Sequence, residues 1–466
     1  TTEIYTLSLH DALPIFGYIN GEYCGIYNLR ERVDDKYFAL KYKIPVESIN
    51  YIENDSLVHR GTKYGYISMF DSVTNMDLTD NNSLDYIYSV IDIDNFIDYV
   101  ATEIFAGNKD WPDNNLRYWN SDKYDKKWRW IIYDMDNTFN LFWDDNLFDV
   151  FVFSLNNSKF GKLFWKLMEN QIIKERFINR SADIYNHYFS KNKLNRIVDS
   201  LANQIKNEIP KHLERWEFSY EDWENSIKSI KTFISQRIEV VSYQIVRHFN
   251  LKDISNFRLS ATIENSCTFQ VNTISPDTLP WEAIYYQGVP ITVTVIPKKD
   301  YIFAGWSDTT LPYSNTVTID LTENYTLEAI MLDKINMDTS IVINEIMYEP
   351  HPAMDSKDWI ELYNPTSKTI NLHNWKLKNS HDTSEFIFPK YYLNPNHYIV
   401  IVQDSTEFSK IYYNIDKIGE FKFNLEKIDE IKLFDNFSRL IDSVYYTNKY
   451  PDRKSTRLNS SHRIRS

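Results

Sequence analysis

The chain has 466 residues, of which 43% are hydrophobic, and a formal net charge of −14 at pH 7. This charge argues against non-specific binding to nucleic acid or anionic lipid, because both require clustered basic residues. The apolar runs are too short to cross a membrane, and the only cysteines, Cys24 and Cys267, offer neither a disulfide framework nor a metal site.

The two ends of the chain differ in character from its middle. Residues 1–15, "TTEIYTLSLHDALPI", and residues 452–466 resemble translated sequencing adapters. Both segments are therefore set aside from fold reasoning, as a cloning scar would be. On this interpretation the chain is a fragment, and neither a signal peptide nor the natural termini can be recognised in it.

Residues 16–250 are predicted to form a mixed α+β domain with a helical C-terminal part. Its first stretch, "FGYINGEYCGIYNL", alternates around Asn20-Gly21, which is a strong hairpin signal. Apolar residues spaced three and four apart predict amphipathic helices in "DIDNFIDYVATEIFAGN" and in three long runs between residues 159 and 250.

After Leu251 the apolar period changes from helical spacing to alternation. Stretches such as "ITVTVIPKKDYIFAGW" and, later, "DWIELYNPTSKTINLHNWKLKN" predict short strands separated by Pro, Gly and Asn turns. We expect a small β repeat module over residues 255–333 and a β-sandwich over residues 340–451. The chain is thus predicted to be multidomain, with one α+β domain followed by two all-β modules.

One polar stretch, "GNKDWPDNNLRYWN" at residues 107–120, is followed after a charged gap by "WRWIIYDMDNTFN". Phosphoryl transfer needs a carboxylate that accepts the proton of the attacking hydroxyl, and hard oxygen ligands for Mg²⁺. Protein kinases use an Asp, an Asn five positions later, and a second Asp after a following strand. Asp110 and Asn115 have this offset, and Asp134 and Asp136 stand where the apolar strand ends.

A simpler interpretation of these residues is structural. Asp, Asn and Pro dominate turns, so "DWPDNN" could be a solvated turn. In the same way, "YDMDN" could do no more than end a strand. The spacing by itself leaves the catalytic and the structural interpretations open.

Four stretches, in this order, resemble the CotH family of spore-coat kinase-like proteins over residues 16 to about 250. They are "FGYINGEYCGIYNLRERVDDKYF", "IDIDNFIDYVATEIFAGNKDWPDNNLRYW", "WRWIIYDMDNTFN" and "IPKHLERWEFSYEDWENSIKSIKTFISQR". The resemblance implies an atypical kinase fold that binds ATP with Mg²⁺ or Mn²⁺ and phosphorylates protein serine. It implies that Asp110 is the catalytic aspartate and that the metal is bound by Asn115, Asp134 and Asp136. Which of the two aspartates is the direct ligand stays open.

Glu31, in "NLRERVDD", is a candidate cofactor-binding residue. We expect it to open a helix and to pair with a phosphate-binding lysine, as a kinase helix glutamate does. Alternatively, Glu31 and Asp34 are ordinary first-turn acids favoured by the helix dipole. The family carries that lysine in an upstream segment that this chain lacks, so we expect the fragment to bind ATP poorly and to be weakly active or inactive.

The two β modules also resemble known families. Residues 255–333 are similar to internalin B-type surface repeats, and residues 340–451 are similar to the lamin-tail domain, an immunoglobulin-like sandwich. Glu345, Asp358 and Glu361 could form a metal cluster, but "INEI" and "WIEL" are structural strands in that family. Both resemblances imply a bacterial protein that is exported or attached to the cell surface.

Two classes of function follow. The first is a secreted or surface serine kinase in which Asp110 orients the serine of a protein substrate, which the acidic charge predicts to be basic and serine-rich. The second is an extracellular adhesion or scaffolding protein with a non-catalytic kinase-like domain. Both place the protein outside the cell or at its surface, with partners bound through the β modules and with no nucleic acid.

Overall fold

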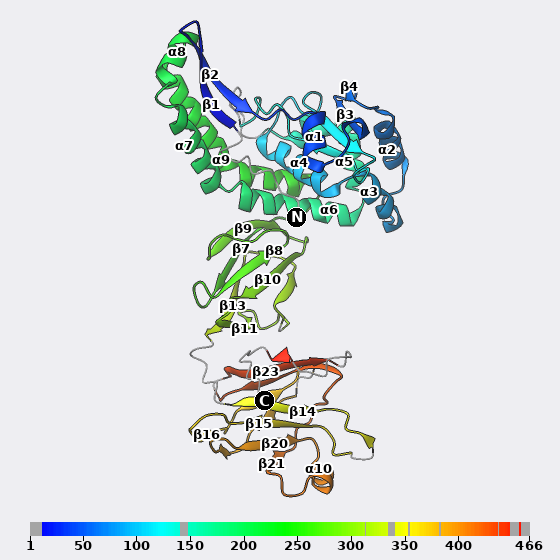
Figure 1. The fold of residues 1–466 in the computed structure, drawn as a ribbon, viewed down its shortest axis with the longest axis vertical. Helices are drawn as coiled ribbons and strands as arrows, with labels where there is room; N and C mark the ends of the chain where they lie inside the picture. The colour runs from blue at the N-terminus through cyan, green and yellow to red at the C-terminus, as the bar shows by residue number, and fades with distance from the viewer. Residues whose placement is uncertain are drawn as a thin grey trace. The chain divides into compact units, whose positions relative to one another are not determined.

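The computed structural model describes residues 12–139, 148–312, 314–333, 341–352, 355–381, 384–436, 438–447 and 456–457. The chain divides into two compact units. The first comprises Thr1–Ser260, Phe269–Val295 and Ser314–Leu327, and the second comprises Ala261–Thr268, Ile296–Tyr313 and Glu328–Ser466. Helices predominate as far as His248 and strands beyond it (Figure 1), which confirms the expected multidomain α and β architecture.

A hairpin of β1 (Ala12–Ile19) and β2 (Glu22–Arg30) begins the described chain. Its turn is Asn20-Gly21, where both residues have positive φ, as the sequence predicts. Strand β1 begins inside the segment set aside as adapter-like, and that boundary stays a prediction. The hairpin lies beside α8 (Ile209–Trp216; Figure 1), where the Ile26 amide donates to Nδ1 of His212 over 3.3 Å.

A four-stranded antiparallel sheet in the order β4-β3-β5-β6 supports the candidate site. Its strands are β3 (Ile49–Glu53), β4 (Leu57–Arg60), β5 (Arg117–Ser121) and β6 (Arg129–Ile131). Tyr118 pairs with Trp130 across β5 and β6, and both side chains are buried. These large aromatic side chains fix the register, because a shift of one residue would turn them to the opposite face of the sheet.

The helices of the first unit surround this sheet and continue beyond it. The α-helices among its described residues are α1 (Asp35–Tyr42), α2 (Tyr64–Asn75), α3 (Leu84–Val90), α4 (Ile93–Ala106), α5 (Lys159–Leu167), α6 (Gln171–Asp183), α7 (Lys191–Ile205), α8 and α9 (Tyr220–His248). Shorter helical turns are η1 (Val46–Ser48), η2 (Asn81–Ser83), η3 (Phe151–Leu155) and η4 (Ile184–Tyr188). Ser219 and Asp222 form a capping box that begins α9, which defines the start of this long helix.

Helix α4 is the buried helix from which the candidate site extends. Asp92 caps its first turn, and Gly107 ends it in the left-handed region with φ 65°. Arg237 of α9 is completely buried and donates to the carbonyl oxygens of Ile104 and Phe105 over 2.6 and 2.8 Å. Because the last carbonyls of a helix have no partners within it, Arg237 satisfies the end of α4 and fixes where the next loop begins.

The β module that follows contributes residues to both units. Its strands are β7 (Ile254–Ala261), β8 (Cys267–Val271), β9 (Trp281–Tyr286), β10 (Ile291–Pro297), β11 (Tyr301–Trp306), β12 (Thr316–Ile319) and β13 (Tyr325–Asp333). Within the first unit β7 pairs with β9 and β10 with β12, and within the second unit β11 pairs with β13, all antiparallel.

Residues of this module that belong to the first unit dock onto α6 through a buried carboxylate. Asp183 is completely buried and accepts hydrogen bonds from the Tyr285 hydroxyl over 2.8 Å and from the Thr273 amide and hydroxyl over 3.0 and 2.6 Å. Asn186, in the turn after α6, exchanges two hydrogen bonds with the backbone of Ile284. These contacts join the module to the helical region through polar pairs around the buried carboxylate of Asp183.

The C-terminal module of the second unit is a β-sandwich. Its strands are β14 (Val342–Met347), β15 (Trp359–Tyr363), β16 (Ile370–Asn371), β17 (Lys376–Lys378), β18 (Phe386–Ile387), β19 (Tyr392–Leu393), β20 (Tyr398–Val402), β21 (Lys417–Gly419), β22 (Ile428–Phe434), β23 (Leu440–Thr447) and β24 (Thr456–Arg457), with the helix α10 (Ser405–Ile411). The two larger sheets have the orders β14-β15-β20-β21 and β18-β17-β22-β23-β24. One core is formed by side chains from both sheets, among them Ile343, Ile360, Ile401, Leu377, Leu433 and Ile441.

Two of the three acidic residues considered as a metal cluster in this sandwich accept hydrogen bonds from neighbouring protein groups. Asp358 accepts from the amides of Glu349 and Leu425 over 3.2 Å each, and Glu361 accepts from the side chain of Asn344 over 2.6 Å. These contacts favour the structural interpretation of the acids over a metal cluster. Across the described ranges, no helix is long and apolar enough to cross a membrane.

Candidate active site

The first site loop follows α4 and carries Asp110. Asn108, which is completely buried, accepts from the amide of Asp110 through its Oδ1 over 3.2 Å. The carbonyl of Asp110 accepts from the amide of Asn114 over 2.9 Å, and the indole of buried Trp111 donates to the hydroxyl of Tyr99 over 2.6 Å. The loop is therefore anchored on both sides of Asp110, whose own side chain is partly exposed.

The second site loop follows β6 and carries Asp134 and Asp136, both exposed. Asp134 lies in the left-handed region with φ 53°, a conformation that is uncommon for residues other than glycine. The loop is tied to the end of α4 and to the first loop by backbone hydrogen bonds. The Phe139 amide donates to the Ala106 carbonyl over 3.0 Å, and the Lys109 amide donates to the Asn137 carbonyl over 3.3 Å.

Side-chain hydrogen bonds bring the two loops together. Nδ2 of Asn137 donates to Oδ1 of Asp110 over 2.9 Å, and Nδ2 of Asn115 donates to the carbonyl of Asp134 over 3.0 Å. Asp110, Asn115 and Asp134 are therefore neighbours in space, although Asp110 and Asp134 belong to different loops. Their catalytic and metal-binding roles stay predictions.

The donor set at this junction is a mixture of carboxylates and amides. Among residues that the structure describes, no three His, Cys, Asp or Glu side chains converge into a metal-binding group. Because Asn115 uses its Nδ2 on Asp134, its Oδ1 is the atom that can serve as a hard ligand beside the carboxylates of Asp134 and Asp136. This oxygen chemistry fits Mg²⁺ or Mn²⁺.

The expectation that Glu31 opens a helix is wrong. Helix α1 begins at Asp35, and Asp34 is its cap, accepting from the amides of Lys36 and Tyr37 over 3.0 and 3.1 Å. Glu31 lies after β2 in a loop, with its side chain exposed. Asp34, the first of the two aspartates in "RERVDD", is a strong N-cap residue, so the helix starts after Glu31 and does not include it.

The position of Asp134 is also supported from the sheet. The guanidinium carbon of Arg117 lies 3.2 Å from the centre of the Tyr133 ring, which precedes Asp134. Arg117 donates to Glu53, which is also bound by His59 over 2.6 Å. A planar guanidinium stacked on an aromatic ring gains cation–π attraction, so Arg117 connects the rigid sheet to the start of the second loop.

Sequence reasoning missed Asn137, Asn108 and Glu103. Glu103 is completely buried in the last turn of α4, and its Oε2 accepts from Nδ2 of Asn108 over 2.9 Å. Burial raises the pKa of Glu103 to about 8, and the Asn108 hydrogen bond opposes this shift. The signal was present in "DYVATEIFA", where a glutamate falls on the same helical face as Tyr99 and Val100.

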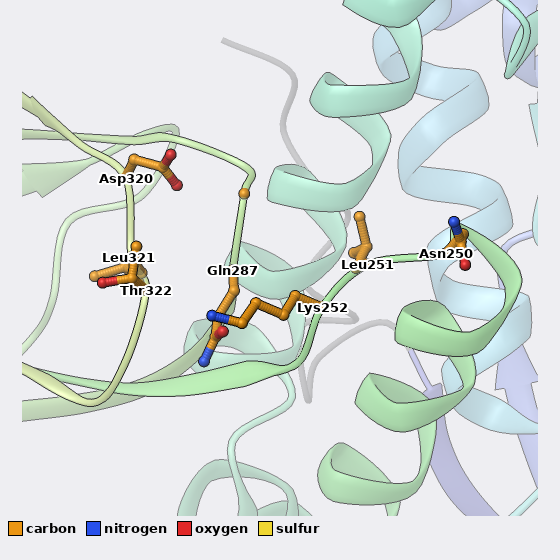
Figure 2. A pocket seen from close by; sticks show the side chains of 8 residues that line it. Asn250, Leu251, Lys252, Gln287, Asp320, Leu321 and Thr322 are labelled. Carbon is orange, nitrogen blue, oxygen red and sulfur yellow. The ribbon is translucent and has the colours of Figure 1, made fainter.

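A separate pocket lies in the first unit, away from the predicted residues. Its volume is about 320 Å³, and its lining side chains are shown in Figure 2: Asn250, Leu251, Lys252, Gln287, Asp320, Leu321 and Thr322, with Gly288 completing the lining. None of the residues proposed from the sequence lines this pocket, so it is not part of the candidate site.

Comparison with known proteins gives two family matches. A family model described as CotH kinase protein matches residues 6–241, and one described as Lamin Tail Domain matches residues 337–448. The similarity of residues 255–333 to surface repeats stays a prediction.

A comparison with curated proteins gives no significant match. One similar solved structure is a DUF4876 family protein from Bacteroides thetaiotaomicron, which is 12% identical, with a TM-score of 0.19, over 42% of this chain and 78% of that one. A likeness this distant carries no argument about function.

Proposed function

The chain belongs to the CotH kinase protein family. We propose that it acts as a protein serine kinase, which transfers the γ-phosphate of ATP to a serine hydroxyl. The observation that supports this proposal most directly is the hydrogen bond of 2.9 Å between Asn137 and Asp110. This hydrogen bond joins the carboxylate of Asp110, on the loop after α4, to the loop after β6 that carries Asp134 and Asp136. A general base needs this kind of orienting partner as well as a suitable position.

Asp110 acts as the proton acceptor in this proposal. Asn137 holds its Oδ1, which leaves Oδ2 to receive the proton of the serine hydroxyl. As the serine oxygen forms its bond to the γ-phosphorus, the bond between that phosphorus and the bridging oxygen of ADP breaks, and ADP leaves with the electron pair. Catalysis of such a loose transition state depends mainly on positioning and charge stabilisation, which is consistent with the anchored loop around Asp110.

Asn115, Asp134 and Asp136 would hold the metal ion. Asp134 is fixed at both sides, through its carbonyl by Asn115 and through the stacked Tyr133 by Arg117. Mg²⁺ or Mn²⁺ supplies positive charge that offsets the charge of the phosphates when ATP binds. Asp136 is exposed and lies two residues beyond Asp134, where it can bind the same ion or a second one.

The substrate and the location are proposed from charge and association. The net charge of −14 favours a basic protein acceptor with accessible serines. The lamin-tail domain suggests that the protein works outside the cell or at its surface, where the β modules would bind partners. This second inference rests on domain association and not on a site.

The test is transfer of labelled γ-phosphate from ATP, with Mg²⁺ or Mn²⁺, to a basic serine-rich acceptor by the full-length natural protein that contains this chain. We expect Asp110→Ala and Asp134→Ala to lower transfer about 100-fold or more. Asp113→Ala is the matched control, because Asp113 is an exposed acid in the same loop and should leave transfer unchanged. Transfer by the folded Asp110→Ala protein at the rate of the wild type would reject the proposal and favour a non-catalytic scaffold.

A further inference from the structure

We propose that Glu103 is a positioning residue, which sets the backbone of the catalytic loop by holding the side chain of Asn108. The inference rests on the proposed function of Asp110, since it states how that residue is kept in place. Glu103 lies in the last turn of α4 and Asn108 just beyond the helix end, so the helix and the loop that carries Asp110 are joined through one amide side chain.

The contacts form a continuous series from the helix to Asp110. Oε2 of Glu103 accepts from Nδ2 of Asn108 over 2.9 Å, and Oδ1 of Asn108 accepts from the amide of Asp110 over 3.2 Å. Nδ2 of Asn108 also approaches the sulfur of Met135 in the second loop at 3.6 Å. Asn108 therefore contacts the helix and both site loops, and Glu103 fixes its orientation.

A glutamate at this position is costly unless its oxygen is needed. Both Glu103 and Asn108 have no exposed surface, and burying a carboxyl group among apolar side chains is unfavourable. Within the described residues, Oε1 of Glu103 has no hydrogen-bond partner, so the group gains only the Asn108 contact through Oε2. A leucine would fill a similar volume without burying a carboxyl group. The function of the glutamate at this position is therefore to accept the hydrogen bond from Asn108.

Two restraints act on Asp110, and they have different origins. Asn137 holds the carboxylate, whereas Asn108 holds the backbone amide. If Asn108 turns, the backbone restraint is lost while the rest of the site keeps its residues. Small displacements of a catalytic group reduce rate far more than they reduce substrate binding. The loss should therefore appear in kcat and leave the KM for ATP nearly unchanged.

A donor–acceptor exchange tests the hydrogen bond itself. Asn108→Asp removes the amide donor, and the assays are run above pH 8, where Glu103 is ionised as well, so that two carboxylates then face each other without a shared proton. The double variant Glu103→Gln with Asn108→Asp restores the bond with donor and acceptor exchanged, and still offers Asp110 an acceptor. Glu103→Leu removes the acceptor and keeps the volume, while Glu103→Gln keeps an acceptor oxygen. Val100→Ala is the control, because it opens a cavity one turn earlier in α4 without touching the loop.

Two readouts are measured in the full-length natural protein: phosphoryl transfer, and hydrogen exchange of the amides at residues 108–114. We expect Glu103→Leu and Asn108→Asp to lower kcat about 10-fold or more, with KM for ATP within about twofold, and to speed exchange at Asp110. Glu103→Gln and the double variant should remain close to the wild type. Val100→Ala should lower the melting temperature without a selective change in this loop.

The two readouts separate the failure of this inference from the failure of the proposed function. If wild type and Asp110→Ala transfer phosphate equally, the kinase proposal fails, and the exchange data still decide whether Glu103 sets the loop. Unchanged exchange at residues 108–114 in folded Glu103→Leu would overturn the positioning role. A double variant as impaired as Asn108→Asp alone would overturn it as well.

Discussion

Asn137 donates a hydrogen bond of 2.9 Å to Asp110, although the two residues are 27 positions apart in the chain. The bond connects a loop that follows a helix with a loop that follows a strand. It holds one oxygen of Asp110 in place and directs the other away from Asn137. This hydrogen bond therefore joins two loops that are distant in the sequence into one candidate site.

Asn137→Leu should lower kcat for phosphoryl transfer about 10-fold to 100-fold, because the carboxylate of Asp110 loses its orienting donor. The KM for ATP should change little, since Asn137 reaches Asp110 and not the predicted metal ligands. Steady-state kinetics with the full-length protein would measure both constants. Asn114→Ala is the control, because its exposed side chain is removed while its amide still donates to Asp110. Equal losses in both variants would contradict the prediction.

Glu103 should give the protein a distinctive dependence of stability on pH. Its pKa is raised by burial from 4.5 to about 8. Between these values the unfolded chain loses the proton while the folded chain keeps it, so the free energy of unfolding falls by about 1.4 kcal/mol per pH unit. The stabilisation is fully present below pH 4.5 and is lost as the pH rises to about 8.

Urea unfolding at pH 5, 6, 7 and 8 would measure this dependence against Glu103→Gln, which cannot ionise. Burial also raises the pKa of Asp98 and of Asp183, but both groups are present in both proteins and cancel in the difference. The free energy of unfolding of Glu103→Gln should therefore rise relative to that of the wild type as the pH increases. Parallel stability curves across this range would show that Glu103 does not titrate in this way.

Asp183→Ala should destabilise the first unit by about 2 kcal/mol or more, because it leaves the buried hydroxyl of Tyr285 without an acceptor and removes the partner of the Thr273 amide and hydroxyl. Asp183→Asn keeps the shape and one acceptor oxygen and should cost less. Chemical unfolding followed by tryptophan fluorescence would measure both variants. Asp199→Ala, which removes only a surface ion pair with Lys231, should change stability by less than about 1 kcal/mol. Similar losses for Asp183→Ala and Asp199→Ala would argue against a buried joint.

Arg237→Lys should lower both stability, by about 2 to 4 kcal/mol, and transfer activity. The planar guanidinium donates to the carbonyls of Ile104, Phe105 and Phe148, and an ammonium group cannot reach all three. The end of α4 would lose fixed partners, and the Asp110 loop begins there. The surface exchange Arg176→Lys keeps an exposed ion pair with Asp94 and should be nearly neutral. Thermal melts and kinetics of the two variants would separate a buried from an exposed arginine.

The chain's larger divisions could be predicted because apolar periodicity is a local signal. The change from helical spacing to alternation after Leu251 marks the end of α9 and the start of β7. The Asn20-Gly21 turn was equally plain, since its residues tolerate positive φ. The spacing of Asp110, Asn115 and Asp134 singled out these residues but left a structural interpretation open, and their proximity became clear only from the hydrogen bonds between the two loops.

The remainder depends on contacts between distant residues. Asn137 was indistinguishable from other turn amides until the structure placed it beside Asp110. Glu103 conflicts with the usual exposure of glutamate, so its role depends on burial that no local pattern shows. Glu31 was expected to open a helix, but Asp34 supplies the cap and the helix begins after it.

The buried joint at Asp183 has a practical meaning for work with isolated domains. The CotH family match ends at residue 241, whereas the acceptor oxygens of Asp183 are occupied by residues 272, 273 and 285. A protein excised at the family boundary would present this carboxylate and its apolar surroundings to water. The smallest fragment that keeps Asp183 enclosed therefore extends through β9. A fragment that ends at the family boundary would lack the residues that complete the packing around Asp183.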